Sequence, residues 1–263
     1  MTMFKETLDS IITATASALR KPADTLDINA FSVPQHFYDI TSFTNMLETA
    51  SKAGYIYRTG QMITHFNSAR LAYSLDSCTE LGLPPDCNLD AEENYVFVID
   101  YGTPFLSLGF AAVGKRLYAQ IAERDWIDVE LEVEDMKNTD NSTAKLPPSA
   151  LERIQDFLGH QLTRRDGDVP ILPSCVLAVI LTGEALEQSM SAMKALIEEA
   201  LPAFKPKFKM SIEPGWVGAY GAAHRARQMV TDEMFIDLER LSDRHGFMEE
   251  ERHPPLQQSH DEL

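Results

Sequence analysis

The feature that most constrains the fold is an uninterrupted apolar run, Tyr95–Ile99, that ends in the carboxylate of Asp100. A continuous run of Val, Ile and Phe predicts a strand buried on both faces, because a half-exposed strand would alternate apolar and polar residues. A turn that contains Gly102 and a second apolar segment, Phe105–Phe110, complete a predicted hairpin. An acid at the carboxyl end of such a strand lies where open α/β sheets bind ligands, so Asp100 is the first candidate site residue. The alternative is that Asp100 serves only the hairpin turn.

A second fully buried strand is expected at Val176–Leu181, and it leads into Thr182, Gly183 and Glu184. Apolar residues at helical spacing predict helices, and shorter apolar or alternating segments predict further strands. The expected helices are 4–19, 41–50, 67–78 with Asn67 as its cap, 151–162, 186–197, 217–224 and 234–238. The further strands are expected at 28–33, 55–63, 116–121, 129–133 and 208–212. This order predicts a mixed α/β fold, with helices packed on a partly antiparallel sheet.

Acidic residues dominate the charge of the chain, which has a formal net charge of −17 over 263 residues. We expect no nucleic-acid partner, since phosphate binding needs a basic surface. We expect no membrane partner either, because anionic lipid would be repelled and no apolar run is long enough to span a bilayer. Neutral or cationic partners remain, or a ligand in a pocket shielded from the overall field.

The cysteines give no sign of a metal site or a disulfide framework, because Cys78, Cys87 and Cys175 lack the spacing of either. The first thirty residues do not resemble a secretion signal, since the start is not basic and the apolar core is weak. We therefore expect a cytoplasmic protein. The endoplasmic-reticulum lumen is the alternative, because the chain ends in the retrieval tetrapeptide His260–Leu263 and carries a glycosylation sequon at Asn141.

Several segments carry a family resemblance when they are taken in chain order. They are Phe31–Phe37, Ala53–Gly54, Ser68–Asp76, the strand through Asp100, Ile180–Glu184 and Val217–Ala223. They resemble motifs of the ATPase domain of DnaK-type heat-shock chaperones, which belongs to the actin and sugar-kinase superfamily. The resemblance spans about residues 4–230 and implies an incomplete actin-like (ribonuclease H-like) ATPase fold. Residues 1–94 would be a remnant of the first lobe, 95–230 the second lobe, and 231–263 an acidic helix and tail.

The departures from this family bear on function. The chaperones' first phosphate-binding hairpin and its lysine would precede the first helix, and no segment here supplies them. His65 replaces a glutamate associated with Mg²⁺, Asp-x-Gly-Gly-Gly-Thr becomes Asp100–Phe105, and the Gly-Gly that cradles adenosine becomes Gly183-Glu184. Phosphoryl transfer depends on amides and cations placed around the phosphates. We therefore expect no ATP hydrolysis, no ATP or Mg²⁺ cofactor, and no metal site.

Three functions remain open. A non-hydrolysing interaction module would pair its exposed sheet edge with a protein partner or with a second copy. A repurposed biosynthetic enzyme of the isomerase or cyclase type would use acid–base chemistry on a small organic molecule in the inherited cleft. The third possibility is nucleotide binding without turnover.

Each function has its own candidate residues. The catalytic candidates are His65, Asp100, Tyr101 and Glu184, with Glu213, His36 and His224 further out, and Tyr101, Phe105 and Trp216 as an aromatic lining. The nucleotide-binding candidates are Gly102, Gly183, Gly218 and Gly221. Every candidate also has a structural interpretation: His65 can cap a helix, Glu184 and Glu213 can be solvated turn acids, and Trp216 can be core.

Overall fold

The protein is described by a computed structural model. The structure describes residues 2–34, 40–55, 59–89, 94–102, 105–113, 123–130, 148–163 and 171–232. The predicted strand at 116–121, the predicted helix at 234–238 and the candidate His36 lie outside these residues. None of the described helices is both long and apolar enough to cross a membrane.

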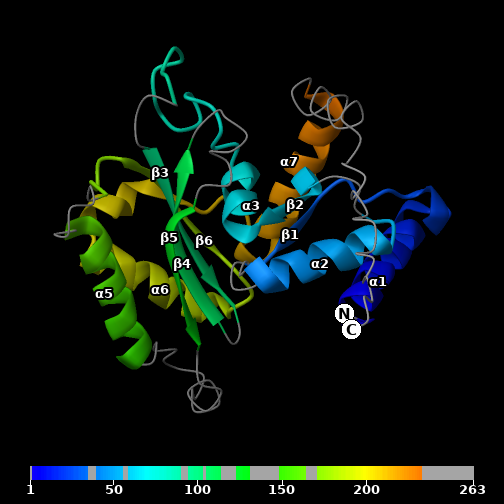
Figure 1. The fold of residues 1–263 in the computed structure, drawn as a ribbon. Helices are drawn as coiled ribbons and strands as arrows, with labels where there is room; N and C mark the ends of the chain where they lie inside the picture. The colour runs from blue at the N-terminus through cyan, green and yellow to red at the C-terminus, as the bar shows by residue number, and fades with distance from the viewer. Residues whose placement is uncertain are drawn as a thin grey trace, which may run out of the picture.

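A five-stranded sheet forms the larger half of the molecule, with the strand order β5-β4-β3-β6-β7 (Figure 1). Its strands are β3 (Asn94–Tyr101), β4 (Phe105–Val113), β5 (Glu123–Glu130), β6 (Val176–Thr182) and β7 (Phe208–Lys209). The central strand β3 pairs antiparallel with β4 and parallel with β6. At the two sides of the sheet, β5 pairs antiparallel with β4, and β7 pairs parallel with β6. The prediction of a mixed α/β fold with a buried hairpin at Asp100 is confirmed.

The two faces of this sheet carry separate apolar cores. Phe97 and Ile99 point to one face, which is covered by α5 (Pro148–Thr163) and α6 (Glu187–Ala200). Val96 and Val98 point to the other face, toward α3 (His65–Ala72) and the segment that follows it. Burial on both faces is the reason that β3 lacks alternation.

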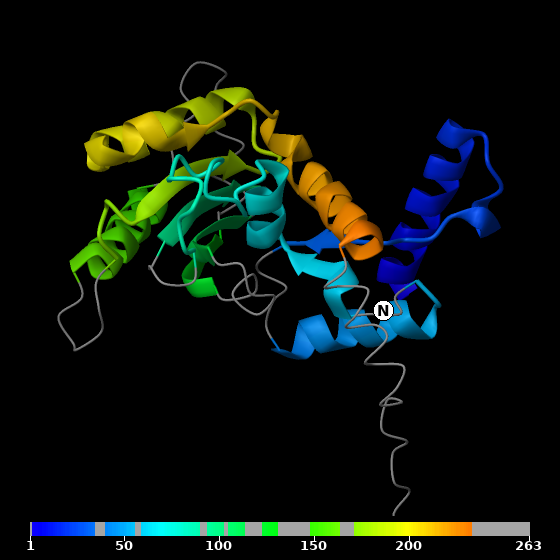
Figure 2. The same cartoon turned by 90° about the horizontal axis from the view of Figure 1, so that it is seen from above.

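A second, two-stranded sheet is formed by β1 (Phe31–Val33) and β2 (Met62–Thr64), which pair in parallel. It packs with α1 (Thr2–Leu19) and α2 (Ile40–Lys52) through a small apolar cluster that contains Leu8, Val33, Ala50 and Met62. The Tyr55 hydroxyl donates a hydrogen bond to the carboxylate of Asp9 on α1, which ties α1 to the end of α2. Figure 2 shows the segment through β1 running from the region of α1 toward the end of α7 (Val217–Thr231).

The two halves meet where α3 and α7 lie side by side (Figure 1). A Cβ atom added to Gly221 on α7 would lie 1.9 Å from the carbonyl oxygen of Ser68 on α3. Only glycine allows this backbone contact, because any side chain would force the helices apart. Gly221 therefore serves helix packing, as the small residues of this segment predict.

Several predicted boundaries are wrong, each for a local reason. Thr64, not Asn67, caps α3, since its hydroxyl accepts a hydrogen bond from the Asn67 amide at 3.3 Å. The same helix ends at Ala72 because Ser74 takes the left-handed conformation, with φ of 54°. The strand expected at 55–63 is limited to β2, β7 has two residues, and β5 begins before the expected 129–133.

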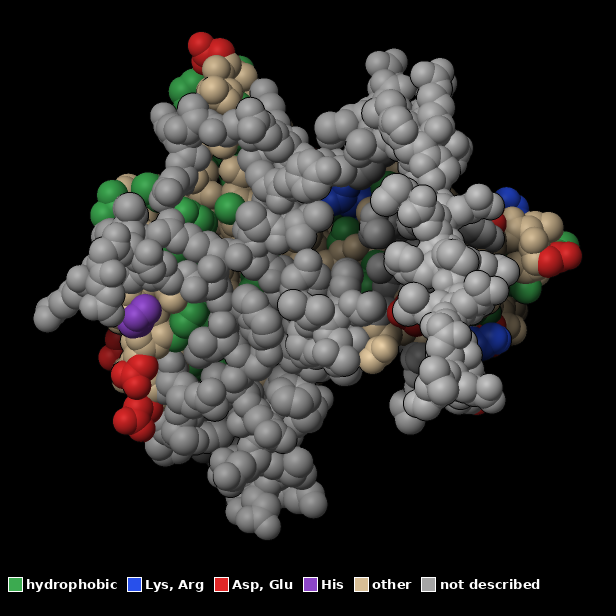
Figure 3. Space-filling model, in the orientation of Figure 1, with side chains coloured by type: hydrophobic (Ala, Val, Ile, Leu, Met, Phe, Trp, Pro, Cys, Tyr) green, Lys and Arg blue, Asp and Glu red, His purple; other side chains and the backbone are tan. Residues whose placement is uncertain are grey.

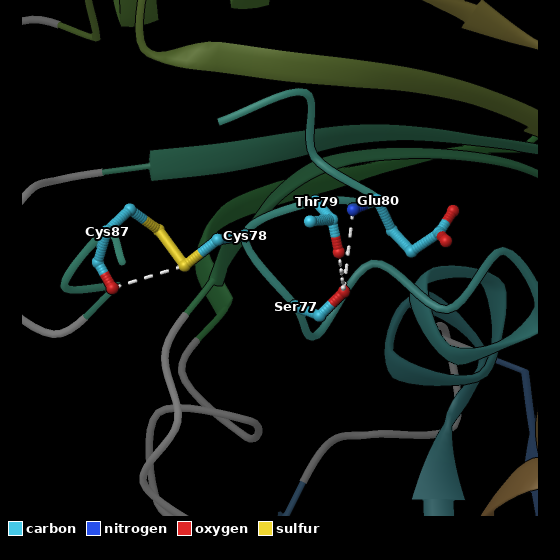
Figure 4. Close-up of a disulfide and its surroundings, with 5 residues drawn as sticks. All are labelled: Ser77, Cys78, Thr79, Glu80 and Cys87. Carbon is cyan, nitrogen blue, oxygen red and sulfur yellow. Dashed lines mark hydrogen bonds between the residues drawn. A yellow bond between two sulfur atoms is a disulfide. The ribbon is translucent and has the colours of Figure 1, made fainter. Parts of the chain in front are cut away.

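A disulfide joins Cys78 to Cys87, so the expectation of unpaired cysteines is wrong for this pair (Figure 4). The chain reverses at Gly82, whose φ of 75° favours glycine, and the Leu83 amide donates to the Cys78 carbonyl at 2.8 Å. This turn brings the two Cα atoms to 5.9 Å, within the normal range for a disulfide. Cys175 is a free cysteine.

Candidate functional site

His65 lies where the two halves of the molecule meet, at the first turn of α3. Its Nε2 atom is 2.9 Å from the Thr182 hydroxyl oxygen and 3.6 Å from a carboxylate oxygen of Asp100. The side chains of His65 and Asp100 are only 16% and 15% exposed, which limits the screening of their interaction by water. The structure thus brings together two of the four predicted catalytic residues.

The hydrogen bonds around Thr182 assign the tautomer of His65. The Thr182 hydroxyl donates its proton to the Pro214 carbonyl at 3.0 Å, so the same oxygen accepts from Nε2–H of His65. The other ring nitrogen, Nδ1, is then the acceptor. A histidine held in this way has a lone pair on Nδ1 that can take a proton, and the Asp100 carboxylate can stabilise the resulting charge.

Gly218 on α7 provides the space for this ring. A Cβ atom at Gly218 would lie 2.8 Å from Cε1 and 3.0 Å from Nδ1 of His65. Both distances are shorter than an ordinary van der Waals contact, so a side chain at position 218 would push the imidazole away. Gly218 therefore positions His65, which is a different role from the nucleotide contact that the family resemblance implies.

A cavity of about 820 Å³ lies next to His65 and is bounded by three segments. One wall is α1, with Leu8, Ile11, Ile12 and Thr15; the second is the stretch through β1, 26–32 with Pro34; the third is α7, with Gly218, Ala219, Ala222, Ala223 and Ala226. His65 and the exposed Glu184 complete the lining, which includes no Lys or Arg among the residues that the structure describes. This volume is in the range of small-molecule sites, about 300–1,000 Å³.

Tyr101 is not part of this arrangement. It follows Asp100 in β3 and packs on the opposite core with Phe97 and Ile99, because neighbouring side chains of a strand point to opposite faces. Burial raises the pKa of the Tyr101 hydroxyl, and a hydrogen bond with Ser189 opposes this effect. The Tyr101 carbonyl accepts from the Ala185 amide at 2.9 Å, so Tyr101 has a structural role.

The two glycine candidates that follow strands lie outside the cavity. Gly183 has φ of 115°, and a Cβ atom there would lie 2.3 Å from the Tyr101 carbonyl oxygen. Gly102 follows β3 at the turn of the hairpin. Neither residue lines the cavity.

The remaining candidates lie elsewhere. Trp216, a candidate for the aromatic lining, does not line the cavity, and because it is 58% exposed the alternative that it belongs to the core is also wrong. Glu213 and His224 are also absent from the lining, and Phe105 begins β4. Within the described segments, no group of three or more His, Cys, Asp or Glu residues could hold a metal ion.

Two residues of the site were missed from the sequence, Thr182 and Ser32. Thr182 ends the second buried strand and is the direct partner of Asp100 in the parallel pair of β3 with β6. Two neighbouring buried strands that both end in a polar residue were a usable signal. The Ser32 hydroxyl is buried beside the cavity and has no hydrogen-bond partner among the described residues.

No protein-family model and no curated protein matches this sequence. Figure 3 shows acidic side chains at several separate places on this face, at the top, the lower left and the right. The site is thus defined by its geometry: an apolar cavity with a histidine, held by a threonine and an aspartate, at one end.

Proposed function

We propose that the protein is a non-hydrolysing relative of the DnaK-type ATPase domain that binds another protein in the cavity beside β1. The main support for binding at this cavity is the set of residues that line it. Phe31 and Ser32 are neighbours in β1 and both line the cavity, although successive residues of a strand point to opposite faces, and no residue of β2 lines it. A cavity on one face would be lined by alternate residues only. The cavity therefore runs along the edge of β1, and exposed sheet edges are sites of strand pairing.

The arrangement of the larger sheet supports the relationship. The order β5-β4-β3-β6-β7, in which β4 runs opposite to the other four strands, is the order expected for one lobe of a ribonuclease H-like fold. Asp100, Gly183 and Gly218 fall at the ends of elements that would face the cleft in such a fold. The shared fold alone does not imply a shared activity.

The charges of the cavity argue against a triphosphate ligand. In the described part of the chain, its lining contains Asp27 and Glu184 and no Lys or Arg. Carboxylates repel phosphate oxygens, and phosphoryl transfer needs cations around them. A protein partner with neutral or basic side chains suits this lining better.

The test compares three forms of the protein as bait in an extract of the cells that make it. Ala222→Trp fills the cavity from α7, and Ala203→Trp places the same side chain at an exposed site outside the lining. We expect the wild type and Ala203→Trp to enrich a common partner that Ala222→Trp does not enrich. Equal enrichment by all three forms would show that the cavity is not the binding site.

A second candidate function is acid–base catalysis on a small organic molecule, such as an isomerisation or a cyclisation. It is favoured by His65, whose Nε2 is engaged by Thr182 and Asp100 while Nδ1 lies on the side of Gly218, a lining residue. Nδ1 would remove a proton from the substrate, and Glu184 could return one. The check is mass spectrometry of a metabolite extract incubated with wild type or His65→Gln. A compound converted only by the wild type would support catalysis, and identical extracts would oppose it.

A further inference from the structure

We propose that the occupant of this cavity is an extended segment of another protein, which adds a strand to the outer edge of β1 and carries basic residues at its two ends. This inference rests on the proposed function and specifies the kind of partner. Among the strands of the described residues, β1 pairs with β2 alone, in the register Phe31↔Met62 to Val33↔Thr64. The cavity lies along the other edge of β1, so a strand placed there would extend the sheet to three strands.

The surroundings of β1 form two walls for such a strand. Val33 packs toward Leu8 of α1, whereas the Ser32 hydroxyl points toward α7, 3.8 Å from the Cβ position of Gly218. The two faces of the small sheet are therefore covered by different helices. Successive side chains of an added strand would point alternately to the α1 wall and to the α7 wall.

The composition of the walls predicts the side chains of the segment. Leu8, Ile11 and Ile12 on α1 are bulky and apolar, and the lining residues of α7 are glycine and alanine. Apolar residues are expected in both directions, with the larger ones toward the small residues of α7 because more space is available there. The buried Ser32 hydroxyl lacks a partner among the described residues and would gain one from a polar group of the added chain.

A second copy of this protein does not fit as the occupant. Residues of both α1 and α7 line the cavity together with β1, so the β1 edge of another folded copy would be equally recessed. Two recessed edges cannot approach to the strand spacing of about 4.8 Å. The net charge of −17 adds repulsion between copies. A linear segment outside a folded core avoids both problems.

The acidic residues predict where the segment carries charge. Asp27 precedes the first residue of β1. Glu184 lines the cavity together with His65, and His65 directly follows Thr64, which pairs with Val33 at the last position of β1. The two carboxylates thus lie toward opposite ends of β1. A Lys or Arg at each end of the segment would complement them and would speed association.

The experiment uses a pool of peptides of about nine residues, with Lys at both ends and randomised apolar residues at alternate positions. Peptides selected on the 263-residue wild type are measured by fluorescence anisotropy. We expect at least about tenfold weaker binding to Ala222→Trp, and similar weakening for peptides N-methylated along one edge, because strand pairing needs backbone N–H groups. Asp27→Asn with Glu184→Gln should weaken the Lys-ended peptides and leave Gln-ended versions unchanged.

The outcomes separate this inference from the proposed function. If no peptide is selected, or if N-methylation has no effect, the strand-pairing inference is wrong. If the cellular partner is nevertheless lost with Ala222→Trp, the proposed function stands with an occupant of another shape. If neither peptides nor cellular partner depend on Ala222, both fail. Thermal unfolding of each variant verifies that it is folded.

Discussion

His65 begins α3 and Asp100 lies near the end of β3, yet Nε2 of the histidine is 3.6 Å from a carboxylate oxygen of the aspartate. Asp100 and Thr182 are direct partners on the neighbouring strands β3 and β6. Both side chains therefore reach the same ring nitrogen of His65, and the hydrogen bond with Thr182 holds the ring. The position of His65 therefore depends on the relative placement of the two halves. Changes at their junction should alter the site before they alter either core.

The first prediction concerns Gly218→Ala. The added methyl group would meet the His65 ring, so we expect the ring to move away from Thr182 and Asp100 with little change in global stability. The measurement is the proton NMR signal of the His65 ring, assigned by its absence in His65→Gln. The control is Gly215→Ala, whose methyl group would have an ordinary contact 3.7 Å from the Gly183 carbonyl. An unchanged His65 signal in Gly218→Ala would contradict the described packing.

The second prediction concerns the contact between α3 and α7. Gly221→Ala should destabilise the protein by about 1–3 kcal/mol or more, because the methyl group would overlap the backbone of Ser68. Gly159→Ala on α5 is the matched control, since nothing lies within 4 Å of its Cβ position. In an exposed helix that change should stabilise by about 0.5–1 kcal/mol. Urea denaturation measures both, and equal effects would disprove the close helix contact.

The sequence predicts the parts of this structure that depend on local pattern. The continuous apolar runs predict two buried strands, at Val96–Ile99 and Val176–Leu181, and the structure contains both. Asp100 marks the end of the first of these strands, which lies next to His65. Alternation along β3 would also have excluded Tyr101 as a partner of Asp100. The disulfide was not predictable in this way, because it depends on the left-handed turn at Gly82.

The cavity was the part of the site least accessible to sequence analysis. It arises from three segments far apart in the chain, α1, β1 and α7, and from the edge of β1 that β2 does not cover. A sequence pattern predicts which face of a strand is buried, but not which edge lacks a neighbour. The interaction hypothesis pointed to an exposed edge only through the family resemblance.

The third prediction is a pH dependence at Tyr101. Burial raises the folded-state pKa of this hydroxyl above its ordinary value of 10.0. The unfolded chain therefore loses the proton first, so the stabilising contribution is complete below pH 10 and is lost as the pH rises through the folded pKa. In an ultraviolet titration, the wild type should contain a tyrosine that ionises at higher pH than the exposed ones, and Tyr101→Phe should lack it. The free energy of unfolding of Tyr101→Phe should also fall less steeply above pH 10 than that of the wild type. If Tyr101→Phe instead lacks a tyrosine that ionises near the ordinary pKa, Tyr101 is exposed to solvent and the prediction is wrong.

The fourth prediction is the absence of stabilisation by nucleotide. A ligand at about one hundred times its Kd stabilises a protein by about 2.7 kcal/mol, which raises the unfolding temperature by several degrees. Because the described lining residues include Asp27 and Glu184 but no Lys or Arg, we expect ATP or ADP with Mg²⁺ to leave the unfolding temperature unchanged. Stabilisation that is lost in Ala222→Trp would place nucleotide in the cavity and contradict this expectation.

The last prediction concerns the disulfide and the cellular compartment. Cys78 and Cys87 close a loop with a sequence separation of 9, and the chain-entropy treatment of such a loop gives about 3 kcal/mol of stabilisation. The double variant Cys78→Ser with Cys87→Ser should lose about this amount in urea denaturation, and its stability should no longer respond to reducing agent. Cys175→Ser should keep that response, because Cys175 is free.

Disulfides persist in oxidising compartments, so we propose the endoplasmic-reticulum lumen over the cytoplasm. Alkylation of the protein in intact cells should label Cys175 and leave Cys78 and Cys87 unlabelled, whereas labelling of all three would place the protein in a reducing compartment.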